Sequence, residues 1–151
     1  MVVFGLISIA LLWVTGVRGS LNLLIGRNVT TSDGVRQRGV PLRVLPLGDS
    51  ITNGKGSSDQ NGYREDFVEL AEAGGPVQMI GSREGNGDMS DNHNEGWNGY
   101  TIDAISAKAT NALKAKPNLV LLLAGTNNMN NASQASTAPA EISQLIDKVS
   151  S

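Results

Sequence analysis

The sequence Leu45-Pro46-Leu47-Gly48-Asp49-Ser50-Ile51-Thr52 runs from an apolar segment directly into a tight turn that carries a serine. The apolar residues predict a buried strand, and the Gly-Asp pair predicts a turn immediately after it. A serine hydroxyl becomes a nucleophile when a base takes its proton and hydrogen-bond donors await the oxyanion. Ser50 is therefore a candidate nucleophile, and its chemistry depends on the donors and the base that the rest of the chain supplies.

Strands and helices alternate along the chain on the C-terminal side of this turn. Predicted strands cover residues 43–47, 77–80 and 119–124, and predicted helices cover residues 63–73, residues 101–114 and a last segment that begins at Thr137. The polar segments 48–62, 81–99 and 125–136 are predicted loops. This order predicts an α/β fold, a three-layer α/β/α sandwich with a parallel sheet, truncated after about three strands.

Each predicted helix carries one apolar face, and each face is expected to pack on the sheet. The inward residues are Tyr63, Phe67, Leu70 and Ala71 in the first helix, Ile102, Ile105, Ala109 and Leu113 in the second, and Ile142, Leu145, Ile146 and Val149 in the third. Thr101 and Thr137 are predicted to cap the second and third helices. The unbroken apolar run at residues 119–124 predicts a strand that is buried on both faces.

The N-terminal segment is apolar and short. Residues 1–16 have only Ser8 and Thr15 as polar residues, and Val17-Arg18-Gly19-Ser20 follows. This pattern predicts a secretory signal peptide over residues 1–19, then an irregular linker at 20–40 and a folded domain at 41–151. The alternative is an uncleaved membrane anchor, which needs about 20 apolar residues. The prediction is a secreted, extracellular protein without stable membrane association after cleavage, and the sequons at Asn28 and Asn131 agree with it.

Composition argues against several kinds of function. The chain has 151 residues and a formal net charge of −2 without a basic cluster, so nucleic acid is not an expected partner. It has no cysteine and one histidine, His93, which leaves no thiol nucleophile and no multi-histidine metal site. No metal or other cofactor is expected. Residues 48–56 resemble a phosphate-binding loop only superficially, because Gly56 stands where that motif needs Ser or Thr after Lys55.

Three of the predicted loops follow strands, and each carries a group suited to binding an oxyanion. Ser50 offers its hydroxyl and its own N–H, Gly99 offers an N–H that no Cβ shields, and Asn127 offers a side-chain amide. In open α/β sheets, ligands bind beyond the carboxyl ends of the strands. We therefore expect these three residues to lie at one edge of the sheet.

This serine, glycine and asparagine, in this order, resemble the motif blocks of the SGNH hydrolase superfamily, also called GDSL-like esterases. Gly48-Asp49-Ser50-Ile51 resembles the first block, residues 96–103 with Gly99 resemble the second, and Gly125-Thr126-Asn127-Asn128 resembles the third. The sequence around these three blocks is similar to the acetylxylan-esterase-like branch, the secreted carbohydrate esterases of family three. The stretches that carry this second likeness are Leu45 to Thr52, Asn61-Gly62-Tyr63-Arg64, Ile80-Gly81-Ser82 and Asn94-Glu95-Gly96.

The resemblance covers about residues 42–151 and implies a function and a set of roles. It implies a serine esterase that acts on acyl groups, acetyl above all, of a polysaccharide or a small ester. Ser50 would be the nucleophile and an oxyanion donor, and Gly99 and Asn127 would complete the oxyanion hole. Trp97 and Tyr100 are candidate substrate-binding residues because aromatic faces suit sugar rings, and the alternative is that they cover the core under a long loop.

The general base of that superfamily is missing from this sequence. The last block of the family supplies Asp-x-x-His, and no such pair occurs here, since Ser90 stands three residues before His93. His93 is expected to be a solvated loop histidine and not the base. The chain alone is therefore expected to be inactive. The alternative function is a non-catalytic carbohydrate-binding remnant or a truncated gene product.

Overall fold

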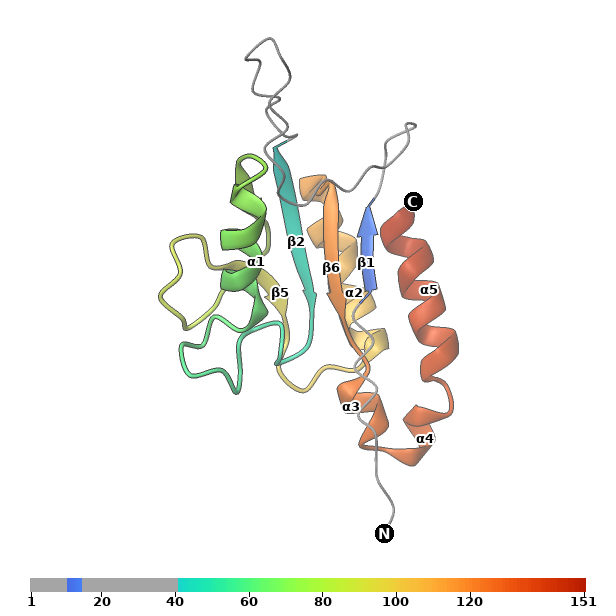
Figure 1. Ribbon diagram of the computed structural model, residues 1–151. Helices are drawn as coiled ribbons and strands as arrows, with labels where there is room; N and C mark the ends of the chain where they lie inside the picture. The colour runs from blue at the N-terminus through green and yellow to red at the C-terminus, as the bar shows by residue number, and fades with distance from the viewer. Residues whose placement is uncertain (1–10, 15–40) are drawn as a thin grey trace.

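The computed structural model describes residues 11–14 and 41–151, and the chain in this part forms helices on both sides of one mixed sheet (Figure 1). The strands are β1 (Leu11–Val14), β2 (Leu42–Gly48), β3 (Val77–Met79), β4 (Arg83–Glu84), β5 (His93–Gly96) and β6 (Leu119–Leu123). The helices are α1 (Tyr63–Glu72), α2 (Ile102–Ala112), a 3₁₀ turn η1 (Leu113–Ala115), α3 (Thr126–Met129), α4 (Ala132–Ala135) and α5 (Ala138–Ser150). The predicted α/β fold is confirmed.

The sheet has the strand order β1-β6-β2-β5-β4, with β3 also paired to β2. Strand β2 is parallel to β3, β5 and β6, whereas β1 is antiparallel to β6 and β4 is antiparallel to β5. The prediction of a parallel sheet with about three strands is therefore right for its centre and wrong for its edges. The short strands β4 and β5 lie within residues 81–99, which the sequence predicted to be a loop.

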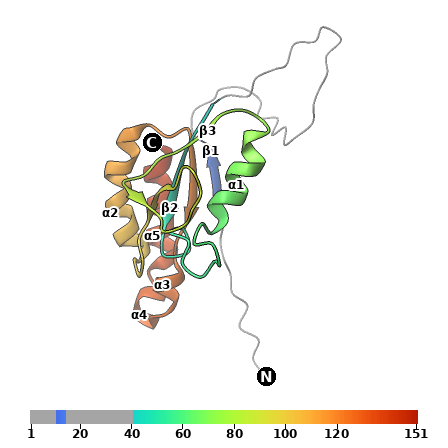
Figure 2. The ribbon, with the colours of Figure 1, turned by 90° about the vertical axis from the view of Figure 1, so that its left-hand side faces the viewer.

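The helices cover the two faces of the sheet, and each face has its own apolar core (Figure 2). Helices α2 and α5 pack on one face, where Leu45, Leu47, Val120 and Leu122 meet Ile105 and Leu145. Helix α1 packs on the other face, where Val44, Met79, Leu119 and Leu121 meet Tyr63, Phe67 and Val68. Successive β6 residues thus alternate between the two cores, which confirms the predicted burial of this strand on both faces.

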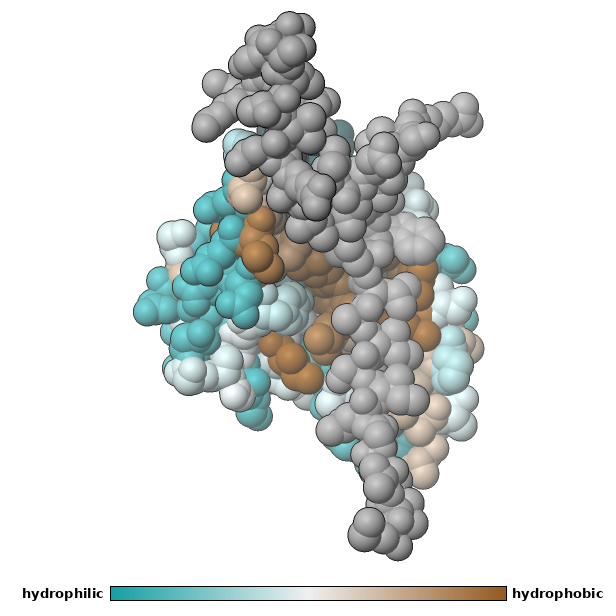
Figure 3. Space-filling model, viewed as in Figure 1, coloured by the Kyte–Doolittle hydropathy of each residue, from teal (hydrophilic) through white to brown (hydrophobic). Residues whose placement is uncertain are grey.

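Figure 3 shows how unevenly polarity is distributed over the α1 side of the molecule. Hydrophobic residues gather over the sheet, and hydrophilic residues cover α1 and the loops beside it. Leu70, predicted to face inward, is 74% exposed. The helix instead buries Arg64 completely, because Arg64 lies on the side of α1 that meets the polar segment 85–92.

The helix ends also differ from the prediction in their contacts. Thr101 and Thr137 stand at the N-cap positions of α2 and α5, but neither side chain makes a capping hydrogen bond. Asn128 Oδ1 accepts the Ile102 N–H at 2.9 Å instead, from across the fold. Asn128 belongs to α3, which with α4 lies in the segment 125–136 that was predicted to be a loop. Asn131 of the second sequon caps α4 by accepting the Ser133 N–H.

The predicted signal peptide at residues 1–19 and the predicted linker at 20–40 lie outside the described residues, apart from β1. Asn28 also lies outside them. Strand β1 lies within the predicted signal peptide. The signal peptide and the linker remain predictions. Among the helices that the structure describes, none has the length and apolar character needed to cross a membrane.

Candidate active site

The candidate site is built at the carboxyl ends of three neighbouring strands. Gly48 at the end of β2 is in register with Gly96 at the end of β5 and with Leu123 at the end of β6. Because these strands are parallel, the segments that follow them leave the sheet at the same edge. The loop with Gly99 follows β5 and not the predicted strand at 77–80. The expected convergence holds, although a different strand produces it.

Close packing at Gly48 and hydrogen bonds from the adjoining residues hold the turn that carries Ser50 in place. Gly48 must be glycine here, because a Cβ would lie 2.2 Å from Leu123 O and 2.3 Å from Thr52 Oγ1. Asp49 is completely buried, and its Oδ1 accepts the Ile51 N–H at 2.9 Å. The backbone then continues through the Asn53 N–H to Asp49 O bond and the Lys55 N–H to Ser50 O bond. These contacts leave Ser50 partly exposed at the edge of the sheet.

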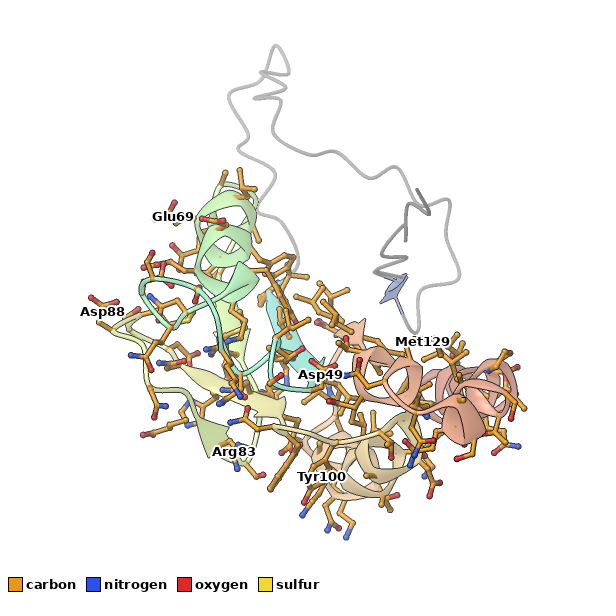
Figure 4. The ribbon with its side chains drawn as sticks, turned by 90° about the horizontal axis from the view of Figure 1, so that it is seen from below. Asp49, Glu69, Arg83, Asp88, Tyr100 and Met129 are labelled. Carbon is orange, nitrogen blue, oxygen red and sulfur yellow. The ribbon has the colours of Figure 1, made fainter. Side chains whose placement is uncertain are left out.

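Asp49 lies near the centre of the molecule when the strands are viewed from their carboxyl ends, with Tyr100 below it and Met129 to its upper right in the view (Figure 4). Its second oxygen, Oδ2, has no hydrogen-bond partner among the described residues. Nearby, Thr52 Oγ1 and the Tyr63 hydroxyl share a hydrogen bond at 3.1 Å. Burial raises the pKa of Tyr63 to about 12, so this phenol stays neutral beside the buried carboxylate. The polar groups under Ser50 therefore act as a support for the turn.

Two backbone N–H groups at this edge are free to bind an oxyanion. Gly99 has φ +78°, a left-handed conformation that other residues rarely adopt. The second loop is fixed by the Trp97 N–H, which donates to Gly48 O at 2.9 Å, and by the Tyr100 N–H, which donates to Trp97 O. In the described part of the chain, neither the Ser50 N–H nor the Gly99 N–H donates to a protein acceptor. Both groups meet the requirement for oxyanion donors, which must be unpaired before substrate binds.

Asn127 joins the third loop to the second. Its Nδ2 donates to Tyr100 O at 2.7 Å, and a carboxamide nitrogen carries two hydrogens. One hydrogen thus orients the side chain and the other remains available. The next residue, Asn128, is buried, and it connects the Ile102 N–H of α2 to Glu141 of α5. Sequence reasoning treated Asn128 only as part of a block, and its position after Asn127 carried no signal of this bridging role.

Trp97 and Tyr100 stack on each other with ring centroids 5.4 Å apart. The Trp97 ring is also covered by the Arg83 guanidinium at 4.5 Å and by Lys108 Nζ at 3.9 Å. Glu95, which is 2% exposed, fixes the indole by accepting from Trp97 Nε1 at 2.9 Å and accepts the Ser82 N–H as well. These contacts agree with the alternative that the aromatic pair covers the core. The predicted role in substrate binding remains a prediction.

His93 lies away from the candidate active site. It begins β5, three residues before Gly96, and a strand rises by about 3.3 Å per residue, so it lies roughly 10 Å from the edge that carries Ser50. Its Nδ1 lies 2.7 Å from Asp91 Oδ1 and its Nε2 lies 3.8 Å from Glu84 Oε1, and its side chain is 47% exposed. The prediction of a solvated loop histidine is right about the exposure of His93 and wrong about the loop, because His93 is the first residue of β5.

The described residues therefore bring the loops with the candidate nucleophile Ser50 and the candidate oxyanion donors Gly99 and Asn127 to one sheet edge, and no histidine among them contacts Ser50. Among these residues, no three acidic, histidine or cysteine side chains gather closely enough to hold a metal ion. An arrangement of this kind suits attack on an acyl carbon, because the donors surround the place where negative charge develops. The base that completes such chemistry is absent from the described site.

Comparison with known proteins supports the same chemistry. Residues 47–151 match the GDSL-like Lipase/Acylhydrolase family. The solved structure of a Clostridium thermocellum family 3 carbohydrate esterase is similar, with a TM-score of 0.56 and 28% identity. The likeness covers 70% of this chain and 57% of that one, so this chain spans just over half of the solved protein. No curated protein matches.

The matched region begins within β2 and contains Ser50, Gly99 and Asn127 together with the whole of β5 and β6. It also makes up more than half of the chain. This chain therefore belongs to the GDSL-like lipase/acylhydrolase family.

Proposed function

We propose that this chain is the part of a secreted serine esterase that holds the nucleophile and the oxyanion hole, and that its substrate is an acetylated polysaccharide. The family and the carbohydrate esterase relative indicate a carboxylic ester hydrolase. The observation that carries the proposal is the meeting of Ser50, the free Gly99 N–H and the Asn127 amide at one sheet edge. The acetyl group, the sugar and secretion rest on the resemblance and on the apolar N-terminus.

The proposed reaction is acyl transfer to Ser50. Its Oγ attacks the ester carbonyl, the carbonyl oxygen becomes an oxyanion, and the sugar hydroxyl leaves with a proton. The N–H groups of Ser50 and Gly99 and the free Asn127 Nδ2 hydrogen bind the oxyanion. A histidine outside this sequence, from the Asp-x-x-His block of the family, takes the Ser50 proton and returns it to the leaving group. Water then releases the acid and restores Ser50.

Without that histidine, the chain alone is nearly inactive. General base catalysis typically contributes about 10²–10⁴-fold to the rate. The missing base also favours a second candidate, a carbohydrate-binding remnant without turnover. The two candidates differ in one property, because an intact nucleophile and oxyanion hole respond to an added base and a binding remnant does not.

Chemical rescue with imidazole tests this difference on the chain as it exists. Release of the phenol from an aryl acetate is followed with and without imidazole, and the Ser50→Ala variant provides the background reaction of imidazole itself. We expect an imidazole-dependent rate above that background, lowered about 10²–10³-fold by Asn127→Ala. Equal rates for the chain and Ser50→Ala at every imidazole concentration would favour the binding remnant. Turnover without imidazole that disappears in His93→Ala would identify His93 as the base.

A further inference from the structure

A groove of about 490 Å³ adjoins the candidate active site, between the loop that follows β2 and two other loops. The lining includes Asn53 and Lys55 from the β2 loop, Asn98 from the loop after β5, and Asn86. Asn53 is three residues beyond Ser50, and Asn98 directly precedes Gly99. A substrate whose ester lies at Ser50 and Gly99 therefore extends naturally into this groove.

Every residue that lines the groove is polar or is glycine. It consists of asparagine, glutamine and serine side chains, glycine backbone and one lysine, without an aromatic or aliphatic side chain. Binding sites for apolar small molecules are lined mainly by hydrophobic side chains. A long acyl chain would gain little here, whereas amides and hydroxyls match the alternating donors and acceptors of a sugar. The groove thus fits the alcohol side of a sugar ester.

Asn53 is the buried residue in this lining that has an unpaired side-chain atom. It is 7% exposed, its Oδ1 has no partner among the described residues, and its Nδ2 lies 3.4 Å from Asn98 Oδ1. That distance exceeds the usual range of about 2.7–3.2 Å for such a bond. The terminal torsion of asparagine is broad, so the Asn53 carboxamide can rotate to offer this oxygen to a ligand. A ligand hydroxyl would then supply the missing partner.

The walls of the groove are joined by buried side chains, so the groove exists before any ligand binds. Asn61 Nδ2 donates to Glu65 and to Asp88, and Asn61 Oδ1 accepts the Met89 N–H. Arg64 donates to Asn92 O at 3.1 Å. Both residues are completely buried and tie the β2 loop and α1 to the segment 85–92. A preformed site spends less free energy on ordering its own groups when it binds.

We propose that this groove binds the neutral sugar residues next to the acylated one, with the carboxamides of Asn53 and Asn98 hydrogen-bonding to sugar hydroxyls. The proposal rests on the proposed function for its substrate class, and it names where the polysaccharide lies. It also gives the Asn61-Gly62-Tyr63-Arg64 stretch a role beside the catalytic blocks, because Asn61 and Arg64 join the segments that carry the groove lining.

Binding of xylohexaose to the full chain tests this proposal without any turnover. The side-chain amide signals of asparagine are followed by NMR during the titration, and the dissociation constant is taken from their shifts. We expect the Asn53 and Asn98 signals to move first, and Asn53→Leu and Asn98→Ala to weaken binding about three- to tenfold, the effect of one or two hydrogen bonds. Asn111→Ala is the matched control, because Asn111 is exposed on α2, and it should leave binding unchanged.

The outcomes separate this proposal from the proposed esterase function. Asn98 is exposed, so Asn98→Ala reports on binding even where Asn53→Leu disturbs the fold. Shifts of the Asn53 and Asn98 amide signals, together with weaker sugar binding in the two variants, support the sugar site whatever the imidazole experiment shows. Shifts confined to Trp97 and Tyr100, no shifts at millimolar sugar, or binding that is lost in Lys55→Ala and unaffected by Asn98→Ala would overturn it.

Discussion

The regions along the two edges of strand β2, the β6 side and the β3–β5 side, are stabilised by different interactions. On the β6 side, helices α2 and α5 and the strands bury aliphatic residues such as Leu45, Leu122 and Leu145, each at most 5% exposed. On the β3–β5 side, the apolar cluster around Val44 and Met79 is accompanied by buried charged and amide side chains, and these join the segments through Asn61, Arg64, Asn94 and Glu95. Apolar burial is non-directional, whereas the second side depends on particular donors meeting particular acceptors.

This difference bears on how the site works. The turn with the candidate nucleophile follows β2, which belongs to both sides, and one candidate oxyanion donor follows each neighbouring strand, Gly99 beyond β5 and Asn127 beyond β6. The apolar side provides a stable base for Asn127. The polar side places Gly99 and shapes the groove, so small changes in its hydrogen bonds should move the site before they unfold the domain.

The largest expected effect is the loss of stability when the apolar side loses a core side chain. Leu45 is fully buried in β2 beneath α2 and α5, and Leu45→Ala should lower the free energy of unfolding by about 2–5 kcal/mol because it leaves a cavity. Urea denaturation measures the change. Leu70→Ala, at a residue that is 74% exposed, should stay within about 0.5 kcal/mol, and an equal loss in both would contradict the assignment of the core.

A smaller effect is expected on the polar side. Arg64→Met keeps much of the side-chain volume but leaves the Asn92 oxygens without their donor, which should cost about 1–3 kcal/mol. Hydrogen exchange should quicken first in residues 85–92. Arg43→Met is the matched control, because Arg43 makes its hydrogen bonds in an exposed position. If Arg64→Met were neutral and exchange unchanged, buried hydrogen bonds would not be what holds this side.

The smallest effect concerns Tyr63 at high pH. Its pKa is raised to about 12 by burial, above the ordinary value of 10, so the neutral phenol is favoured in the folded state. The associated stability is fully present below pH 10 and is lost as the pH rises toward 12, with a loss of about 1.4 kcal/mol by pH 11. Tyrosinate absorbance should show a late titration that Tyr63→Phe removes, and its persistence in that variant would show that it does not belong to Tyr63.

The apolar side could be predicted from the sequence, and the polar side could not. The apolar runs at β2 and β6 and the spacing of Ile105, Ala109 and Leu145 follow simple periodicity, and these residues lie in the core as predicted. Strand β5 reads His-Asn-Glu-Gly, without a β-branched or aromatic residue, so its pattern predicted a loop. It forms because β5 pairs in parallel with β2 and because Glu95 accepts hydrogen bonds from the Ser82 N–H and from Trp97 Nε1.

The same division applies to the site. Ser50, Gly99 and Asn127 were identified from block motifs, and the register of β2, β5 and β6 brings their loops to one edge as expected. Asn128 and Asn53 were not identified, because an asparagine that bridges two helices and one that lines a groove look alike in a sequence. Their roles depend on partners 26 residues away for Asn128 and 45 residues away for Asn53.

The sequence by itself determined the α/β class, the apolar layers and the three residues that point to acyl transfer, because hydrophobic periodicity and turn motifs are local properties of the chain. It also determined that this chain carries one histidine and no Asp-x-x-His. Only the tertiary structure decided that β5 carries the Gly99 loop to the edge, that His93 pairs with Asp91 instead of Ser50, and that Asn61 and Arg64 shape a groove. Directional hydrogen bonds between distant residues form only once the chain has folded, so no local pattern encodes them.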